Sequence, residues 1–199
     1  MDKILKDLFS FQDIEYKDFT SKLIPTVDKD LIIGVRTPDL RNYAKKLFKE
    51  DEKRTFEFLN NLHHKYYEEN NLHGCLIEQI KDFNLAMEYT EKFVPFIDNW
   101  ATCDLFSPKV FKKYPNETYS YILDWIKDEK TYVIRYGIGL LLSNYLDENF
   151  KEEHLEIVSN VRSKEYYVNM MIAWYFATAL AKQQKYAIKY IENKKLDDW

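Results

Sequence analysis

The sequence predicts an all-α protein built from short helical hairpins. The 199 residues include only 4 Gly and 5 Pro, whereas an all-β fold of this length needs many more turn residues. Nearly every segment repeats its apolar residues with a helical period, and only a few residues separate neighbouring segments. Short connections favour antiparallel helices. Because no low-complexity linker interrupts the chain, we expect one domain over residues 1–199.

The apolar periodicity places the individual helices. Residues 4–9 and 19–24 form two short apolar stripes, and Pro25 ends the second. A clear helix start follows at "TPDLRNYAKKLFKE", where Thr37 suits the N-cap and Pro38 suits the first helical position. The preceding "LIIGV" is the best strand candidate, and we interpret it as a short buried link. The remaining helices are expected near residues 52–62, 66–81, 84–97, 117–127, 130–146, 150–161, 164–182 and 184–193.

A faint internal repeat indicates how these helices are arranged. The segments Tyr67–Gly74, Tyr132–Gly139 and Tyr167–Trp174 can be aligned, and the last two lie 35 residues apart. Two-helix units that repeat every 35 to 45 residues are typical of a HEAT-like α-solenoid with a concave face. Chance matches in a helical chain with 16 Tyr are the alternative interpretation.

Composition limits the classes of function. The net charge is −4, whereas DNA-binding proteins are usually basic, so any DNA contact must come from local positive charge. Neither a signal peptide nor an apolar run near 18 residues is present, which predicts a cytoplasmic protein without a membrane partner. Two isolated cysteines, Cys75 and Cys103, predict reduced thiols and no disulfide framework.

The stretch "DNWATCD" holds the first candidate site residues. Trp100 and Asp104 are four residues apart, which places an indole and a carboxylate side by side on a helix. Such a carboxylate can stabilise a developing cation or orient a water molecule. Alternatively, Trp100 packs in the core and Asp104 caps the turn before Pro108.

Candidate contacts to phosphate or to a substrate lie further along the chain. Arg135 interrupts an apolar helix, and a guanidinium group binds phosphate as a fork, although a salt bridge is the alternative. The cluster Lys109, Lys112 and Lys113 can meet a DNA backbone or form a solvated face. Taken alone, Trp174 in "NMMIAWYFATALAK" is typical of a core residue.

No metal or cofactor site is expected from the sequence. His63 and His64 are adjacent and should point apart on a helix, while His73 and Cys75 are too close together to chelate well. The sequence also contains no Gly-rich phosphate loop, no G-x-S-x-G and no helical H-E-x-x-H.

Four stretches together resemble a known family. "IIGVRTPDLRNYAKKL", "DNWATCD", "VIRYGIGLLL" and "IAWYFATALAK" are similar, in order and approximate spacing, to the AlkD-like family of HEAT-like repeat DNA alkylation repair proteins. The resemblance covers nearly the whole chain. Catalytic members use a Trp and an Asp on one helix, an Arg two helices later and a second Trp further on. The matching positions here are Trp100, Asp104, Arg135 and Trp174.

The resemblance implies a monomeric, monofunctional glycosylase that removes N3- or N7-alkylpurines from duplex DNA without a cofactor. Residues 11–30 depart from the family, because acidic residues outnumber lysines where catalytic members have a helix that enters the minor groove. A subgroup without that helix is not expected to excise bases. The departure and the acidic net charge predict weak to moderate DNA affinity. A non-catalytic DNA-binding module and a protein-interaction scaffold therefore remain alternatives.

Overall fold

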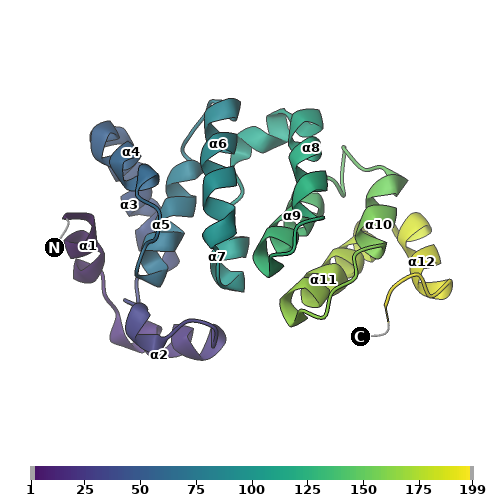
Figure 1. The fold of residues 1–199 in the computed structure, drawn as a ribbon, viewed down its shortest axis with the longest axis horizontal. Coiled ribbons are helices and arrows are strands. Elements are labelled where there is room, and N and C mark those ends of the chain that lie inside the picture. Colours follow the sequence, from purple (N-terminus) through teal and green to yellow (C-terminus); the bar gives the residue numbers. More distant parts are fainter. Residues whose placement is uncertain (1–2, 198–199) are drawn as a thin grey trace. The chain divides into compact units, whose positions relative to one another are not determined.

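A computed structural model describes residues 3–197 of the chain (Figure 1). Over these residues the protein forms twelve α-helices, three short 3-10 helices and no β-strand. An isolated antiparallel bridge joins Gln12 and Val35. The prediction of an all-α protein is therefore confirmed. Contacts group the chain into two compact units, Met1–Val110 and Phe111–Trp199.

The α-helices of the first unit, except the last, lie close to the stretches where the apolar periodicity predicts helices. They are α1 (Lys3–Ser10), α2 (Ile14–Leu23), α3 (Thr37–Glu50), α4 (Glu52–Asn60), α5 (Tyr67–Ile77), α6 (Phe83–Phe93) and α7 (Trp100–Leu105). The 3-10 helices η1 (Lys29–Leu31) and η2 (Val94–Phe96) lie between them. Helix α5 packs against α3, α4, α6 and α7, so it forms the centre of this unit.

Three local predictions are corrected in this unit. Thr37 is the first residue of α3, and the N-cap is Arg36, which makes no side-chain capping bond. The helix expected over 84–97 changes to a 3-10 turn after Phe93, because Pro95 has no N–H for an α-helical hydrogen bond. His63 and His64 do not lie on a helix, because α4 ends at Asn60.

The link before α3 is short and buried, as predicted. The backbone N–H groups of Ile33, Gly34 and Val35 donate to the carboxylate of Glu68 on α5, at 2.7, 2.6 and 3.2 Å. Gly34 has a φ of 97°, and a Cβ there would lie 2.4 Å from the carbonyl oxygen of Asp13, so only glycine fits. Burial raises the pKa of Glu68, and the three N–H groups oppose that rise.

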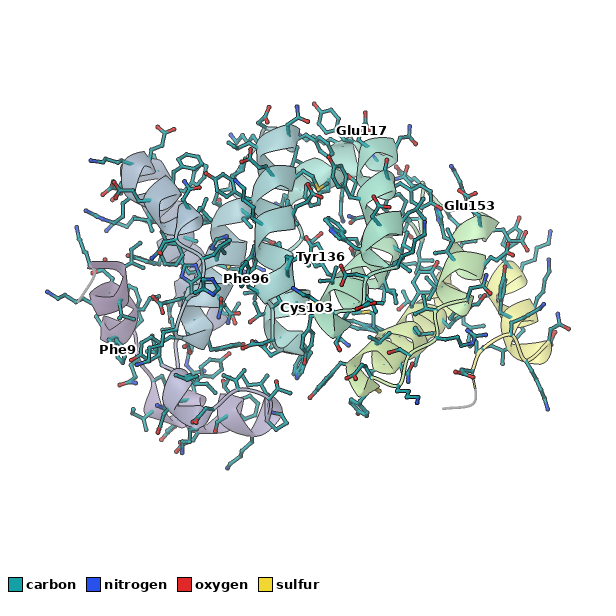
Figure 2. All side chains as sticks on the ribbon, viewed as in Figure 1. Phe9, Phe96, Cys103, Glu117, Tyr136 and Glu153 are labelled. Carbon is teal, nitrogen blue, oxygen red and sulfur yellow. The ribbon has the colours of Figure 1, made fainter. Side chains whose placement is uncertain are left out.

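The second unit is built around two long helices. Its α-helices are α8 (Pro115–Trp125), α9 (Thr131–Asn144), α10 (Glu152–Ser159), α11 (Tyr166–Lys182) and α12 (Gln184–Glu192). Helix α9 packs against α8 and α11, and α11 also packs against α12. Gly137 allows the close approach of α8, because a Cβ there would lie 3.0 Å from Cγ1 of Ile126. Glu117 and Glu153, labelled in Figure 2, occupy the first turns of α8 and α10, where a carboxylate favours the helix dipole.

The three aligned sequence segments begin at similar places in their helices. Tyr67 is the first residue of α5, while Tyr132 and Tyr167 are the second residues of α9 and α11. The alignment therefore follows helix boundaries. Cys75 and Cys103 are both buried. Within residues 3–197, each helix is too short or too polar to cross a membrane.

Candidate functional site

Helix α7 carries Trp100 as its first residue and Asp104 one turn later. The N-cap Asn99 accepts the N–H of Thr102 through Oδ1 at 2.8 Å. The Asn99 amide also donates to Oγ1 of Thr102 at 3.0 Å, and that hydroxyl donates to Oδ1 of Asn71 on α5 at 2.8 Å. All three polar side chains are buried. This network joins the start of α7 to α5.

The other end of α7 is held by an ion pair. Arg41 on α3 pairs with Glu78, the C-cap residue of α5. Nη2 of Arg41 also donates to the carbonyl oxygen of Leu105 at 2.6 Å. Glu78 in turn accepts the N–H of Ser107 at 3.0 Å. The chain that follows Asp104 is therefore bonded to two other helices.

The two candidate residues on α7 have different surroundings. Trp100 is half-buried, and its indole N–H donates to the carbonyl oxygen of Leu23 at the end of α2, at 3.1 Å. Asp104 is exposed. The indole is thus anchored by its polar edge, while the carboxylate is accessible from solvent.

Arg135 and Trp174 lie in the second unit. Arg135 is 5% exposed, and its Nη1 donates to the carbonyl oxygen of Tyr167 at 2.7 Å, which ties α9 to the first turn of α11. Trp174 is 50% exposed, so it does not take the core position that its apolar sequence context suggests. Met170 and Tyr166 lie one and two turns before Trp174, respectively, and are also exposed, which gives α11 an apolar outer stripe.

The predicted lysine cluster is exposed. Lys109, Lys112 and Lys113 lie in the 3-10 helix η3 (Lys109–Lys113), and none of them forms an ion pair with another described residue. Their ammonium groups are therefore available to a phosphate backbone, while a solvated face is equally consistent with this arrangement.

Two histidines form a partly buried contact that the sequence did not predict. Nε2 of His64 lies 2.9 Å from Nδ1 of His73. The His64 ring stacks on Phe58 and the His73 ring stacks on Phe93, and the ring centroids of each pair are 4.3 Å apart. Burial lowers the pKa of His64 to about 4 and that of His73 well below its usual value. No group of three or more potential metal ligands occurs among the described residues. Helical spacing could not reveal this pair, because His64 lies in a loop.

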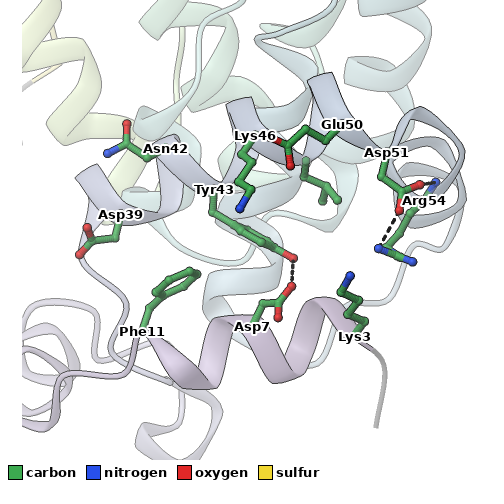
Figure 3. A pocket seen from close by; sticks show the side chains of 11 residues that line it. Lys3, Asp7, Phe11, Asp39, Asn42, Tyr43, Lys46, Glu50, Asp51 and Arg54 are labelled. Carbon is green, nitrogen blue, oxygen red and sulfur yellow. Dashed lines mark hydrogen bonds and ion pairs between the residues drawn. The ribbon is translucent and has the colours of Figure 1, made fainter.

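A groove of about 660 Å³ lies between α1 and the α3–α4 hairpin (Figure 3). The Tyr43 hydroxyl donates to Asp7 across it at 2.9 Å, and Arg54 pairs with Asp51 at 2.7 Å. Its lining mixes acidic and basic side chains and includes none of the predicted site residues.

The fold and the α7 geometry define a helical protein with an exposed carboxylate one turn from an anchored indole. The sequence profile of the DNA alkylation repair enzyme family matches residues 4–197, so the chain belongs to that family. No curated protein matches the chain.

Proposed function

We propose that this protein is a monofunctional DNA glycosylase that hydrolyses the N-glycosidic bond of N3- or N7-alkylpurines in duplex DNA. The observation that carries the proposal is the exposure of Asp104 on the same short helix as the anchored Trp100. Membership of the DNA alkylation repair enzyme family supports a DNA lesion as the substrate.

The chemistry needs little more than a well-placed negative charge. An N3- or N7-alkylated purine is already cationic, so it can leave with the bonding electron pair and become neutral without being protonated. The sugar then has oxocarbenium character, which the Asp104 carboxylate stabilises electrostatically. Water adds to C1′ and releases a proton to the carboxylate or to solvent. The ring faces of Trp100 and Trp174 attract the cationic base and sugar.

The proposal extends to the arrangement of the helices. We expect the helical pairs to stack as a HEAT-like solenoid whose concave face binds one DNA duplex. Arg135 and Trp174 must then reach the same duplex as Trp100 and Asp104, with Lys109, Lys112 and Lys113 contacting phosphates. Crosslinking a duplex with a single lesion to cysteines placed beside Trp100 and beside Trp174 tests this requirement.

Base release is the direct test of the activity. The wild-type protein should release 7-methylguanine from a duplex that contains one such base, and it should leave the abasic strand uncut because the proposed reaction uses no lysine nucleophile. A wild-type protein that binds this duplex but releases no base would contradict the glycosylase proposal.

A non-catalytic DNA-binding module is the second candidate, because Arg135 is almost fully buried and the net charge is −4. This candidate predicts binding without release. With few phosphate contacts, the slope of log affinity against log salt should be small, at about −0.9 for each phosphate contacted.

A further inference from the structure

We infer that Arg41 and Glu78 are positioning residues that hold Asp104 in its reactive orientation. The inference rests on the proposed function, because it assigns these two residues a part in the same reaction. Neither was predicted as a site residue from the sequence, although Arg41 lies within "TPDLRNYAKKL", one of the stretches that carry the family resemblance.

Helix α7 is too short to fix Asp104 by itself. It has six residues, and isolated helices of fewer than about 12 residues are marginal in water. The last four carbonyl groups of any helix lack an intrahelical partner, and Leu105, the residue directly after Asp104, contributes one of them. The backbone at Asp104 therefore depends on the groups that bind the end of α7, in addition to the network that holds its start.

Arg41 and Glu78 supply that binding at two points of the backbone. Arg41 donates to the Leu105 carbonyl with one nitrogen and pairs with Glu78 through another. Glu78 uses its second carboxylate oxygen to accept the N–H of Ser107. A carbonyl and an N–H two residues apart are thus fixed by one ion pair, which limits rotation of the backbone just after Asp104.

The pair is suited to holding a position because it is partly removed from solvent. The side chain of Glu78 is 15% exposed and that of Arg41 is 37% exposed. Hydrogen bonds between charged groups are stronger and more directional than neutral ones, and the guanidinium fork can serve two acceptors at once. A lysine at this position can approach one acceptor closely but cannot reproduce the fork.

The expected consequence is a loss of rate without a loss of affinity. A displacement of about 1 Å at a reacting group can cost about 10²-fold in rate. We expect Arg41→Lys to lower the single-turnover rate of 7-methylguanine release by about 10- to 100-fold, with duplex affinity changed by less than about 2-fold. The matched control is Arg54→Lys, which weakens another Arg–acid pair of the same unit, the one with Asp51 beside the groove.

A double variant separates positioning from general loss of stability. If Arg41 acts through Asp104, then Arg41→Lys should slow release little further when Asp104→Asn is already present. If Arg41 matters only for stability of the fold, the two effects on rate should multiply. Multiplicative effects, or an equal loss of rate in Arg54→Lys, would overturn the inference.

Hydrogen exchange provides a readout that does not depend on activity. In protein without DNA, Arg41→Lys and Glu78→Ala should each speed exchange of the Ser107 amide by at least about 10-fold, whereas Arg54→Lys should not. Unchanged Ser107 exchange overturns the inference even if the wild type releases bases. Absence of release by the wild type overturns the proposed function, and the exchange result then decides on its own whether the ion pair holds α7.

Discussion

Helices α7 and α9 each carry one charged residue of the candidate site, but they are stabilised in different ways. Helix α7 has six residues and is held at both ends by side chains from α3 and α5, and its Asp104 is exposed. Helix α9 has 14 residues and a largely buried surface, and its Arg135 is 5% exposed. One charge is accessible to a substrate, while the other joins two helices.

The difference indicates what each charge can do. Solvent screens the interactions of an exposed carboxylate, which therefore contribute little to folding, so its removal should act mainly on chemistry. A buried guanidinium that donates to a backbone carbonyl contributes to stability, because its loss leaves a partly buried acceptor without that partner.

Asp104→Asn should have the largest effect, and it should be an effect on rate. The variant keeps the shape of the side chain but removes the negative charge that faces the oxocarbenium-like sugar. Loss of one well-placed electrostatic group typically costs about 10²–10³-fold in rate. Duplex affinity should hold or rise slightly, because a carboxylate repels phosphates. Single-turnover release and affinity, measured on a duplex with one 7-methylguanine, check this prediction.

The matched control is Asp124→Asn, which removes an exposed carboxylate from α8. Both variants should unfold in urea within about 0.5 kcal/mol of the wild type, as is usual for surface substitutions. If both variants release bases at the wild-type rate, Asp104 has no role in the reaction.

Arg135→Met should act mainly on stability. Hydrogen bonds from charged groups contribute about 1.5–3 kcal/mol, and the bond from Arg135 to Tyr167 is partly buried. We therefore expect a loss of about 2 kcal/mol in the free energy of unfolding, measured by urea denaturation. DNA binding and rate should fall together if Arg135 also contacts a phosphate.

Arg162→Met is the control for the loss of an arginine. Arg162 is exposed, and its guanidinium group donates to the carbonyl oxygens of Ser159, Val161 and Lys195. Because water can reach these carbonyls, its replacement should cost less than about 1 kcal/mol. An equally small effect of Arg135→Met would remove the contrast between α7 and α9.

Much of the fold was predictable from the sequence because it depends on local patterns. The apolar period predicts the helices. Pro95 and Pro115 lie in the first turns of η2 and α8, because proline lacks the backbone N–H that a position inside a helix needs. The Arg41–Glu78 pair was not predictable, because it joins residues 37 positions apart through a guanidinium fork and two backbone groups. Sequence spacing carries no signal for such a contact.

The site was predictable only as a set of residue types. The exposure of Asp104 agrees with a role in chemistry, and the exposure of Trp174 excludes the simple core interpretation. The burial of Arg135 could not be read from the sequence, because an arginine in an apolar helix suits both a phosphate contact and an internal hydrogen bond. Tertiary packing alone decides between these environments.

Acid should weaken the part of the protein that supports α7. His73 lies on α5 and stacks on Phe93, which in turn contacts Phe106 just after α7. Burial lowers the pKa of His64 in the folded protein to about 4, while its ordinary value is 6.5. Between these two pH values the unfolded chain binds a proton at His64 and the folded protein does not. Stability from this group is complete above pH 6.5 and is lost as the pH falls toward 4.

For His64 alone, lowering the pH from 8 to 5 should cost about 2 kcal/mol in the free energy of unfolding. His64→Gln should be less sensitive over this range, as measured by urea denaturation at each pH. His63→Gln is the control, because His63 is adjacent and exposed. The pKa values of His73 and His154 are also lowered by burial, and both residues are present in every variant. A parallel pH dependence in wild type and His64→Gln would contradict the prediction.

The smallest expected effect concerns the two tryptophans. Trp100→Phe keeps an aromatic face but loses the indole N–H that donates to Leu23, so the bond between α7 and α2 disappears. A hydrogen bond of this kind contributes about 1 kcal/mol.

Trp174→Phe should change stability by less than about 0.5 kcal/mol, because half of that side chain is exposed and its indole N–H has no hydrogen bond to the described residues. Urea denaturation of both variants measures the difference. If Trp174→Phe is as destabilising as Trp100→Phe, then Trp174 is held as firmly as Trp100. The exposed ring of Trp174 then serves to stabilise the fold and is not a free surface for a lesion. If only Trp100→Phe is destabilising, the protein combines one anchored indole with one that remains available to a substrate.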